Sequence, residues 1–202
     1  MRLSKLIRRN LRDERGSFSV EAILMFPLLA WAFMAMYVFF EGLRESNINL
    51  KAAYTVSDLL SREHDELITD DYMNGMHTVF AWLTRTKNPV QMRVTVIRYE
   101  EDSDIHENYW SKGVGVPDLL QADISEVVSP HVPIMADESI AIVVETWASY
   151  DPILDMGLQD TNLYNIVVTA PRFAGELNYE GMGDGTGDVH DDGTGDGEDN
   201  TI

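Results

Sequence analysis

The feature that most constrains this chain is a run of 19 uncharged, mostly apolar residues at positions 22–40, bounded by Glu21 and Glu41. At about 1.5 Å per helical residue the run is roughly 29 Å long, close to the hydrocarbon thickness of a bilayer. A buried core helix is the alternative, but the apolar runs of such helices are usually about 10–14 residues long. The run therefore predicts a transmembrane helix at residues 17–41, with Pro27 bending it near its start.

The distribution of charge predicts the orientation of this helix. Residues 1–16 hold six basic and two acidic residues, a net of +4, whereas the whole chain carries −19 and its remainder therefore −23. Basic residues beside a short N-terminal segment hold that end in the cytoplasm. We therefore expect a single-pass membrane protein with a cytoplasmic leader at 1–16 and an exported C-terminal part. Such an acidic exported part is unsuited to binding nucleic acid, which requires basic surface.

A cleaved secretory signal peptide would also place the C-terminal part outside the cytoplasm. Its apolar region would be about 7–15 residues long and would end in small residues at the cleavage site. Here the run is longer and ends in Phe39-Phe40-Glu41-Gly42, which lacks that pattern. The helix is therefore expected to stay with the protein.

Residues 42–178 are expected to form one α+β domain, with an antiparallel sheet packed on an amphipathic extension of the membrane helix. Apolar residues recur at threes and fours through 41–64, and a second helix follows from Asp70 towards Asn88-Pro89. A further helix is predicted at 117–128. From residue 90 on, the pattern of apolar residues also predicts four strands, of which the third is expected to be central. They are residues 90–97, 105–110, 139–150 and 163–170.

The last segment, 179–202, is expected to be a disordered acidic tail. Residues 181–202 contain seven glycines, seven acidic residues and no lysine or arginine, so they cannot bury enough surface to offset their ordering entropy. Two near repeats, 184–188 and 192–196, place aspartates beside glycines as calcium loops do. Neither matches the twelve-residue EF-hand or the nine-residue β-roll pattern. A soluble tail is the favoured interpretation, and weak calcium binding is the alternative.

A second motif lies where the leader meets the apolar run. Gly16 is followed by small and apolar residues and, five positions on, by Glu21, which is the layout of a type IV prepilin leader. A membrane-embedded aspartyl peptidase would cut between Gly16 and Ser17, because glycine permits close backbone approach. Glu21 would then need compensation for an unpaired carboxylate at the edge of an apolar helix. The new amino group of Ser17, on its own or a neighbouring subunit, would supply it and set the axial register. Alternatively, Glu21 only flanks an anchor, as Glu41 does.

Residues 15–29, RGSFSVEAILMFPLL, resemble the N-terminal signature of the TadE-like proteins of tight-adherence pilus systems. Members typically show a Gly, a small residue, a Val-Glu pair, apolar residues, a Pro and a leucine-rich stretch. A looser similarity extends over residues 12–175. The resemblance implies a minor pilin or pseudopilin of the bacterial inner membrane with its C-terminal domain in the periplasm. Such a protein is processed by a prepilin peptidase and takes part with other pilins in the assembly of a Flp-type pilus for surface attachment. The pilins of this system tend to have Tyr after the Glu, where this chain has Ala22.

Three classes of function compete. The first is this minor pilin or pseudopilin, and the second is an uncleaved bitopic protein with a periplasmic interaction domain. An anchored enzyme ranks last, because the chain shows no Gly-x-Ser-x-Gly, Walker or zinc-protease motif. His64, thirteen residues before His77, favours a solvated acidic helix end over a metal site. We therefore expect no enzyme activity, cofactor or metal, and the lack of cysteine excludes disulfides.

Overall fold

The computed structural model describes residues 17–63, 67–154, 156–173 and 177–180. The predictions for the leader, including Gly16, and for the acidic tail beyond residue 180 lie outside the described residues. So does His64. The described residues form an α+β structure with one long N-terminal helix.

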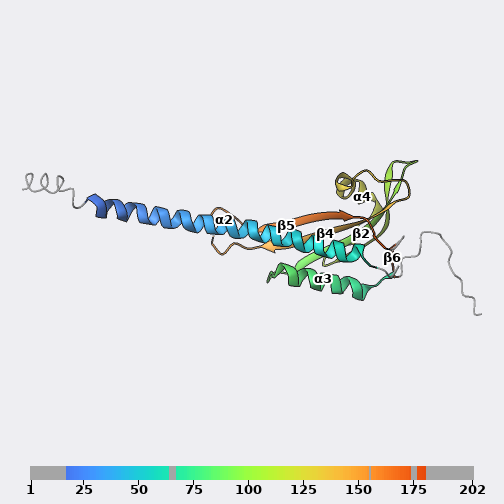
Figure 1. The fold of residues 1–202 in the computed structure, drawn as a ribbon, viewed down its shortest axis with the longest axis horizontal. Helices are drawn as coiled ribbons and strands as arrows, with labels where there is room; N and C mark the ends of the chain where they lie inside the picture. The colour runs from blue at the N-terminus through green and yellow to red at the C-terminus, as the bar shows by residue number, and fades with distance from the viewer. Residues whose placement is uncertain (1–16, 64–66, 155, 174–176, 181–202) are drawn as a thin grey trace, which may run out of the picture.

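That helix, α2, is continuous from Ser17–Ser61, and Pro27 lies inside it without ending it. A proline is tolerated near the start of a helix, since the first backbone N–H groups have no intrahelical acceptor, but Pro27 is ten residues further in and removes one hydrogen bond. Figure 1 shows the N-terminal half of α2 projecting away from the domain, while its C-terminal half lies along the sheet. Val38 is the first fully buried apolar residue along it. The long helix expected from the sequence is confirmed.

Four antiparallel strands form the main sheet in the order β3-β2-β4-β5. Their bounds are β2 Val90–Glu100, β3 Ile105–Val114, β4 Ile140–Tyr150 and β5 Thr161–Thr169. The prediction of a four-stranded antiparallel sheet is confirmed, and β4 is central as expected. A register shift between Val96 and Ile97 marks a bulge in the β2–β3 ladder, which increases the local twist.

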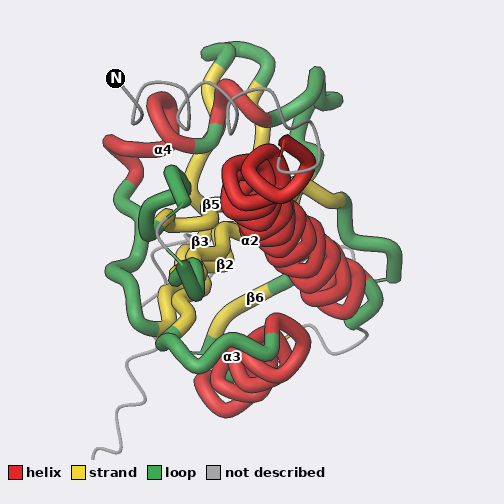
Figure 2. The backbone as a smooth tube through the Cα atoms, turned by 90° about the vertical axis from the view of Figure 1, so that its left-hand side faces the viewer, coloured by secondary structure: helices red, strands yellow, loops and turns green. Residues whose placement is uncertain are grey.

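The first face of the sheet packs against α2 and α3. Helix α3, Asp70–Thr84, begins at Thr69, whose hydroxyl accepts a hydrogen bond from Tyr72 N, and ends at Arg85 in the left-handed conformation. Figure 2 shows α2 and α3 beside each other on one side of the strands. Side chains at every fourth position of α2 meet α3 and the inward positions of the strands, as in this core cluster: Ala52, Val56, Leu60, Met73, Phe80, Met92, Val94, Ile142 and Val144.

The second face of the sheet is also covered, by the short helix α4, Gln121–Val127, and the turn η2, Ser129–His131. A separate apolar cluster forms there from Ile97, Leu119, Ile124, Val128, Ala141 and Val143. The central strands are therefore buried on both faces, and the polar members of β2 on this side, Arg93 and Thr95, are buried as well.

The helix predicted to begin at Pro117 begins four residues later, so that boundary was wrong. Residues 117–120 are held in a non-helical conformation beside β3. The Asp118 carboxylate accepts a hydrogen bond from Gly113 N at 2.7 Å, and Ser111 Oγ accepts one from Leu119 N at 2.9 Å. These bonds oppose the helical turn that the local sequence favours.

A small parallel pair, β1 Leu67–Ile68 and β6 Asn178–Tyr179, was not anticipated from the sequence. It ties the end of the described chain to the start of α3. The Tyr179 hydroxyl donates to the Asp70 carboxylate, and Lys112 Nζ lies 3.0 Å from the same carboxylate. These two contacts, Tyr179 first, lower the pKa of Asp70.

Burial on α3 predicts a sharp contrast between two aromatic residues. Phe80 is fully buried in the first core, so Phe80→Ala should lower the free energy of unfolding by about 3–5 kcal/mol. Trp82, two residues on, is 75% exposed, and Trp82→Ala should change it by no more than about 0.5 kcal/mol. Denaturant unfolding of the detergent-solubilised chain, followed by circular dichroism, measures both. Equal effects of the two variants would contradict this core.

Candidate functional site

The membrane-spanning candidate is the N-terminal half of α2. Within the described residues it is the one helix long and apolar enough to cross a bilayer, by length and composition, and only 6% of its most apolar window is buried. Large apolar side chains are exposed all round it, among them Phe18, Ile23, Phe26 and Phe33. Since a core helix would be covered on at least one face, this exposure favours a lipid environment.

The site residues predicted near the leader lie on this same exposed segment. Ser17 is the first residue of α2, Glu21 is an exposed residue in its second turn, and Pro27 follows. Glu21 makes no hydrogen bond or ion pair with any residue that the structure describes. The structure therefore places these residues along one helix, away from the domain, and brings none of them to a partner (Figure 1).

The domain meets α2 where the apolar run ends. The β4–β5 connection reaches the helix at Gly42, where an added Cβ would lie 2.8 Å from Leu158 Cδ2 and 3.5 Å from Tyr150 Cε1. Glycine at this position lets the Leu158 side chain lie directly against the helix. Beside it is a cavity of about 170 Å³, which we call the apolar cavity, lined by Phe39, Gly42, Leu43, Tyr150, Leu158, Thr161 and Leu163.

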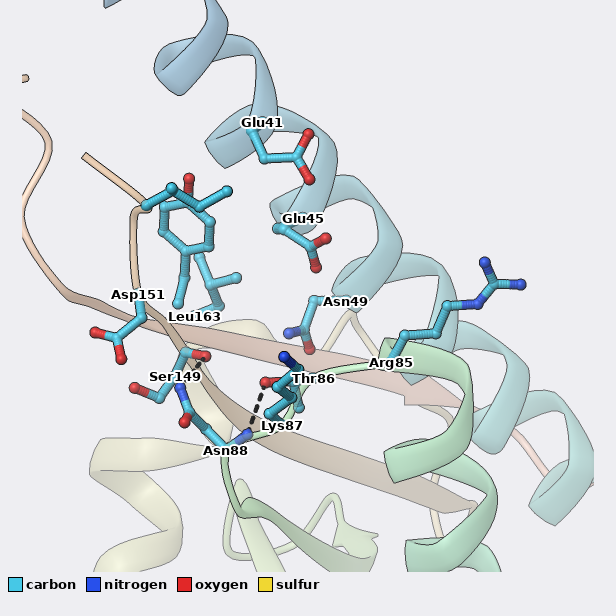
Figure 3. A pocket seen from close by; sticks show the side chains of 12 residues that line it. Glu41, Glu45, Asn49, Arg85, Thr86, Lys87, Asn88, Ser149, Asp151 and Leu163 are labelled. Carbon is cyan, nitrogen blue, oxygen red and sulfur yellow. Dashed lines mark hydrogen bonds between the residues drawn. The ribbon is translucent and has the colours of Figure 1, made fainter.

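A larger cavity of about 300 Å³, which we call the boundary cavity, lies next to it and shares Tyr150 and Leu163. Residues from α2, the loop between α3 and β2, the end of β4 with the residues that follow it, and β5 line this cavity (Figure 3). Glu41, Glu45 and Asn49 are spaced by four residues and share one face of α2. Arg85 and Lys87 come from the loop, and Figure 3 shows the guanidinium of Arg85 extending away from the cavity.

Some polar groups of the boundary cavity are paired. Glu41 Oε1 accepts from Arg44 Nη1 at 3.0 Å on α2 itself. Asn88 links the loop to β4, because its Nδ2 donates to Ser149 O at 3.4 Å, and its backbone N–H donates to Thr86 Oγ1 at 3.2 Å. The first bond ties the loop to β4 and the second lies within the loop; both are drawn in Figure 3.

Asn49 is the exception. Its side chain is 97% buried, yet its Oδ1 has no hydrogen-bond partner among the described residues. A buried acceptor left in that state costs about 1–3 kcal/mol. Tyr150 on the opposite wall has a raised pKa, firstly because of burial and then because of the carboxylates of Glu41 and Glu45. The cavity thus presents acceptors and negative charge on its α2 side.

A second polar cluster lies on the sheet face opposite α2. Arg93 Nη2 and Nε lie 2.6 and 2.7 Å from Glu145 Oε2, and the Tyr164 hydroxyl donates to Oε1 at 2.9 Å. Arg93 also donates to Pro117 O and lies 5.3 Å from the centre of the Trp147 ring. Burial and the Glu145 charge raise the pKa of Tyr164. Since the groups satisfy one another, this cluster joins β2, β4 and β5 structurally.

The histidines have structural contacts. His77 Nε2 lies 2.9 Å from Val90 O, His106 Nδ1 lies 2.9 Å from Ser129 Oγ, and His131 Nδ1 lies 3.2 Å from Val127 O. Across the described ranges, no group of three or more His, Asp or Glu residues is placed to hold a metal ion.

Comparison of the chain with known protein families, curated proteins and solved structures gives no match. The resemblance to TadE-like proteins therefore stays a prediction from the residues. Sequence reasoning singled out Glu21 and Pro27, whose roles stay predictions, and did not point to Asn49, Arg85 and Lys87. The residue types and spacing of these three carry no signal, because the cavity exists only after segments far apart in the sequence have packed.

The buried ion pair predicts a large asymmetry between single and double substitutions. Glu145→Gln leaves Arg93 buried without its counter-charge and should lower the free energy of unfolding by about 3–5 kcal/mol. The double variant Arg93→Met/Glu145→Leu should recover most of that loss, because it removes both charges.

A matched control is Arg62→Gln, which breaks an exposed ion pair with Asp58 at 2.9 Å and should cost about 0–1 kcal/mol. Thermal and denaturant unfolding measure all three variants. A double variant as unstable as Glu145→Gln would show that the cluster does more than pair two buried charges.

Proposed function

We propose that this chain is a TadE-like minor pilin or pseudopilin of a bacterial inner membrane. In this proposal the N-terminus is cytoplasmic, the α+β domain is periplasmic, and the mature helix packs with other pilins during assembly of a Flp-type pilus. The single observation that carries it is the apolar half of α2, which is exposed on all sides and projects from the domain. A free apolar surface of this size requires lipid or other apolar helices around it.

Two further features support assembly over simple anchorage. The Gly16–Glu21 motif lies directly at the start of the apolar segment, and Glu21 has no partner among the described residues. A carboxylate inside or beside hydrocarbon is retained only where it is functional or paired. A prepilin peptidase and partner pilins would provide the new amino group and the neighbouring helices.

The second candidate is an uncleaved bitopic protein whose periplasmic domain docks other assembly proteins. The observation that favours it is strand β5, Thr161–Thr169, which forms one edge of the sheet and contains no charged residue and no proline. Edge strands usually carry such residues to prevent pairing with another strand, so β5 offers a surface for strand addition.

Processing separates the two candidates. Mass spectrometry of the membrane-extracted chain should find a mature N-terminus at Ser17. Gly16→Val should abolish that cleavage, since a branched side chain prevents close approach to the scissile bond. Ser17→Ala, which keeps a small residue after the bond, should be cleaved as before. An intact leader in the unaltered protein, with the helix in the membrane, would instead support the bitopic candidate.

The role of Glu21 is tested by comparing it with the carboxylate at the other end of the apolar run. Glu21→Ala should leave membrane insertion intact but reduce crosslinking to partner pilins at least tenfold, because a charge-assisted hydrogen bond contributes about 1.5–3 kcal/mol. Glu41→Ala should have little effect on assembly, since Glu41 pairs with Arg44 of its own helix. Normal crosslinking of Glu21→Ala would refute the register role.

A further inference from the structure

The boundary cavity lies at the depth of lipid headgroups if α2 spans a bilayer. Glu41 is the first charged residue after the apolar run, and Glu45 lies one turn, about 6 Å, beyond it. The polar layer on each side of the hydrocarbon is roughly 5–8 Å thick. Glu41 and Glu45 therefore lie within reach of the headgroups of the lipids around α2, and the cavity extends past that layer to Asn49, about 12 Å beyond Glu41.

The α2 side of this cavity is complementary to a cationic hydrogen-bond donor. Asn49 Oδ1 is buried and lacks a donor, and no described residue is hydrogen-bonded or ion-paired to the Glu45 carboxylate one turn before it. A primary ammonium group carries both the positive charge and the N–H donors that these acceptors lack. A quaternary ammonium group carries the charge but has no N–H to donate.

The side of the cavity formed by the loop between α3 and β2 is complementary to an anion. Lys87 lines the cavity across from Glu45 and Asn49, and Arg85 lies two residues before it at the end of α3 (Figure 3). Both cations are exposed, so their side chains are free to turn towards a phosphate. The cavity thus sets acceptors and cations on facing walls.

The adjacent apolar cavity supplies the third part of the site. It shares Tyr150 and Leu163 with the boundary cavity and continues along α2 to Phe39, inside the apolar run. A ligand with an ammonium, a phosphate and an attached acyl chain would fill the two cavities in the order in which they follow the membrane normal.

We propose that the boundary cavity binds the headgroup of an ethanolamine phospholipid. Its ammonium group donates to Asn49 Oδ1 and Glu45, its phosphate pairs with Lys87, and the glycerol end lies against Leu158 and Phe39. The assignment rests on the membrane anchorage in the proposed function, and it is independent of leader cleavage and of pilus assembly.

The test is native mass spectrometry of the full chain reconstituted in nanodiscs containing equal amounts of phosphatidylethanolamine, phosphatidylcholine and phosphatidylglycerol with identical acyl chains. Phosphatidylethanolamine should remain bound about tenfold more often than phosphatidylcholine, because only the primary ammonium satisfies Asn49. Equal retention of the three lipids, or preferential retention of phosphatidylglycerol, would overturn the assignment.

Two pairs of variants localise the effect. Asn49→Leu should remove the preference, whereas Asn47→Leu, an exposed asparagine on the same helix, should keep it. Glu45→Gln should weaken it several-fold, whereas Glu101→Gln in the distant β2–β3 turn should not. Circular dichroism of each variant verifies folding, and a preference that survives both Asn49→Leu and Glu45→Gln would overturn the site.

A soluble headgroup distinguishes a lipid from a free metabolite of the same chemistry. Glycerophosphoethanolamine should compete only weakly, since it lacks the acyl chain that fills the apolar cavity, and competition as strong as the lipid's would overturn the lipid assignment. A chain that fails to enter nanodiscs at all would contradict the proposed anchorage instead. The lipid preference is measured on the Glu21→Ala protein too, so a failure of assembly leaves it readable.

Discussion

The whole structure depends on α2 being one unbroken helix that is solvated in two different ways. Its N-terminal half offers apolar side chains in every direction, whereas its C-terminal half buries one face, with Ala52, Val56 and Leu60 packed in the core against the sheet. The hydrophobic effect satisfies the second half within the chain itself. The first half has no such partner in the described structure, so its environment must come from outside the domain.

The sheet is covered on both faces, which makes the domain at the C-terminal end of α2 rigid. Its central strands contribute residues to two apolar clusters. One cluster also contains residues of α2 and α3, and the other contains a residue of α4. On the α4 side, Arg93 is paired with Glu145 and Thr95 Oγ1 lies 2.9 Å from Ser111 Oγ, so neither side chain is buried without a partner. Ser57 Oγ and Thr169 Oγ1, 2.9 Å apart, add a polar contact between α2 and the edge strand β5.

Local patterns were sufficient for most elements and insufficient wherever distant segments decide. The apolar run gave α2, and alternation gave β2, since period and composition are local properties. The start of α4 was placed too early because bonds from Asp118 and Ser111 hold the preceding residues beside β3. The two-residue pair β1–β6 and the boundary cavity have no local signature. The pair joins segments about a hundred residues apart, and the cavity is lined by several elements that are distant in the sequence.

The electrostatics of the chain give the cations at the membrane boundary a consequence beyond a single ligand. A chain with a net charge of −19 is repelled by an anionic bilayer surface, and that repulsion would act on a domain tethered next to it. Arg44, Arg85 and Lys87 all lie in or beside the first turns after the apolar run, where the surface is closest and screening is least complete. These three cations offset the carboxylates of Glu41, Glu45 and Asp151 at the same boundary, so this end of the domain is close to neutral while the rest of the chain is acidic. Under the proposed anchorage, the covalent helix sets the distance from the bilayer, and the near-neutral end of the domain is the end that meets the least repulsion from its surface.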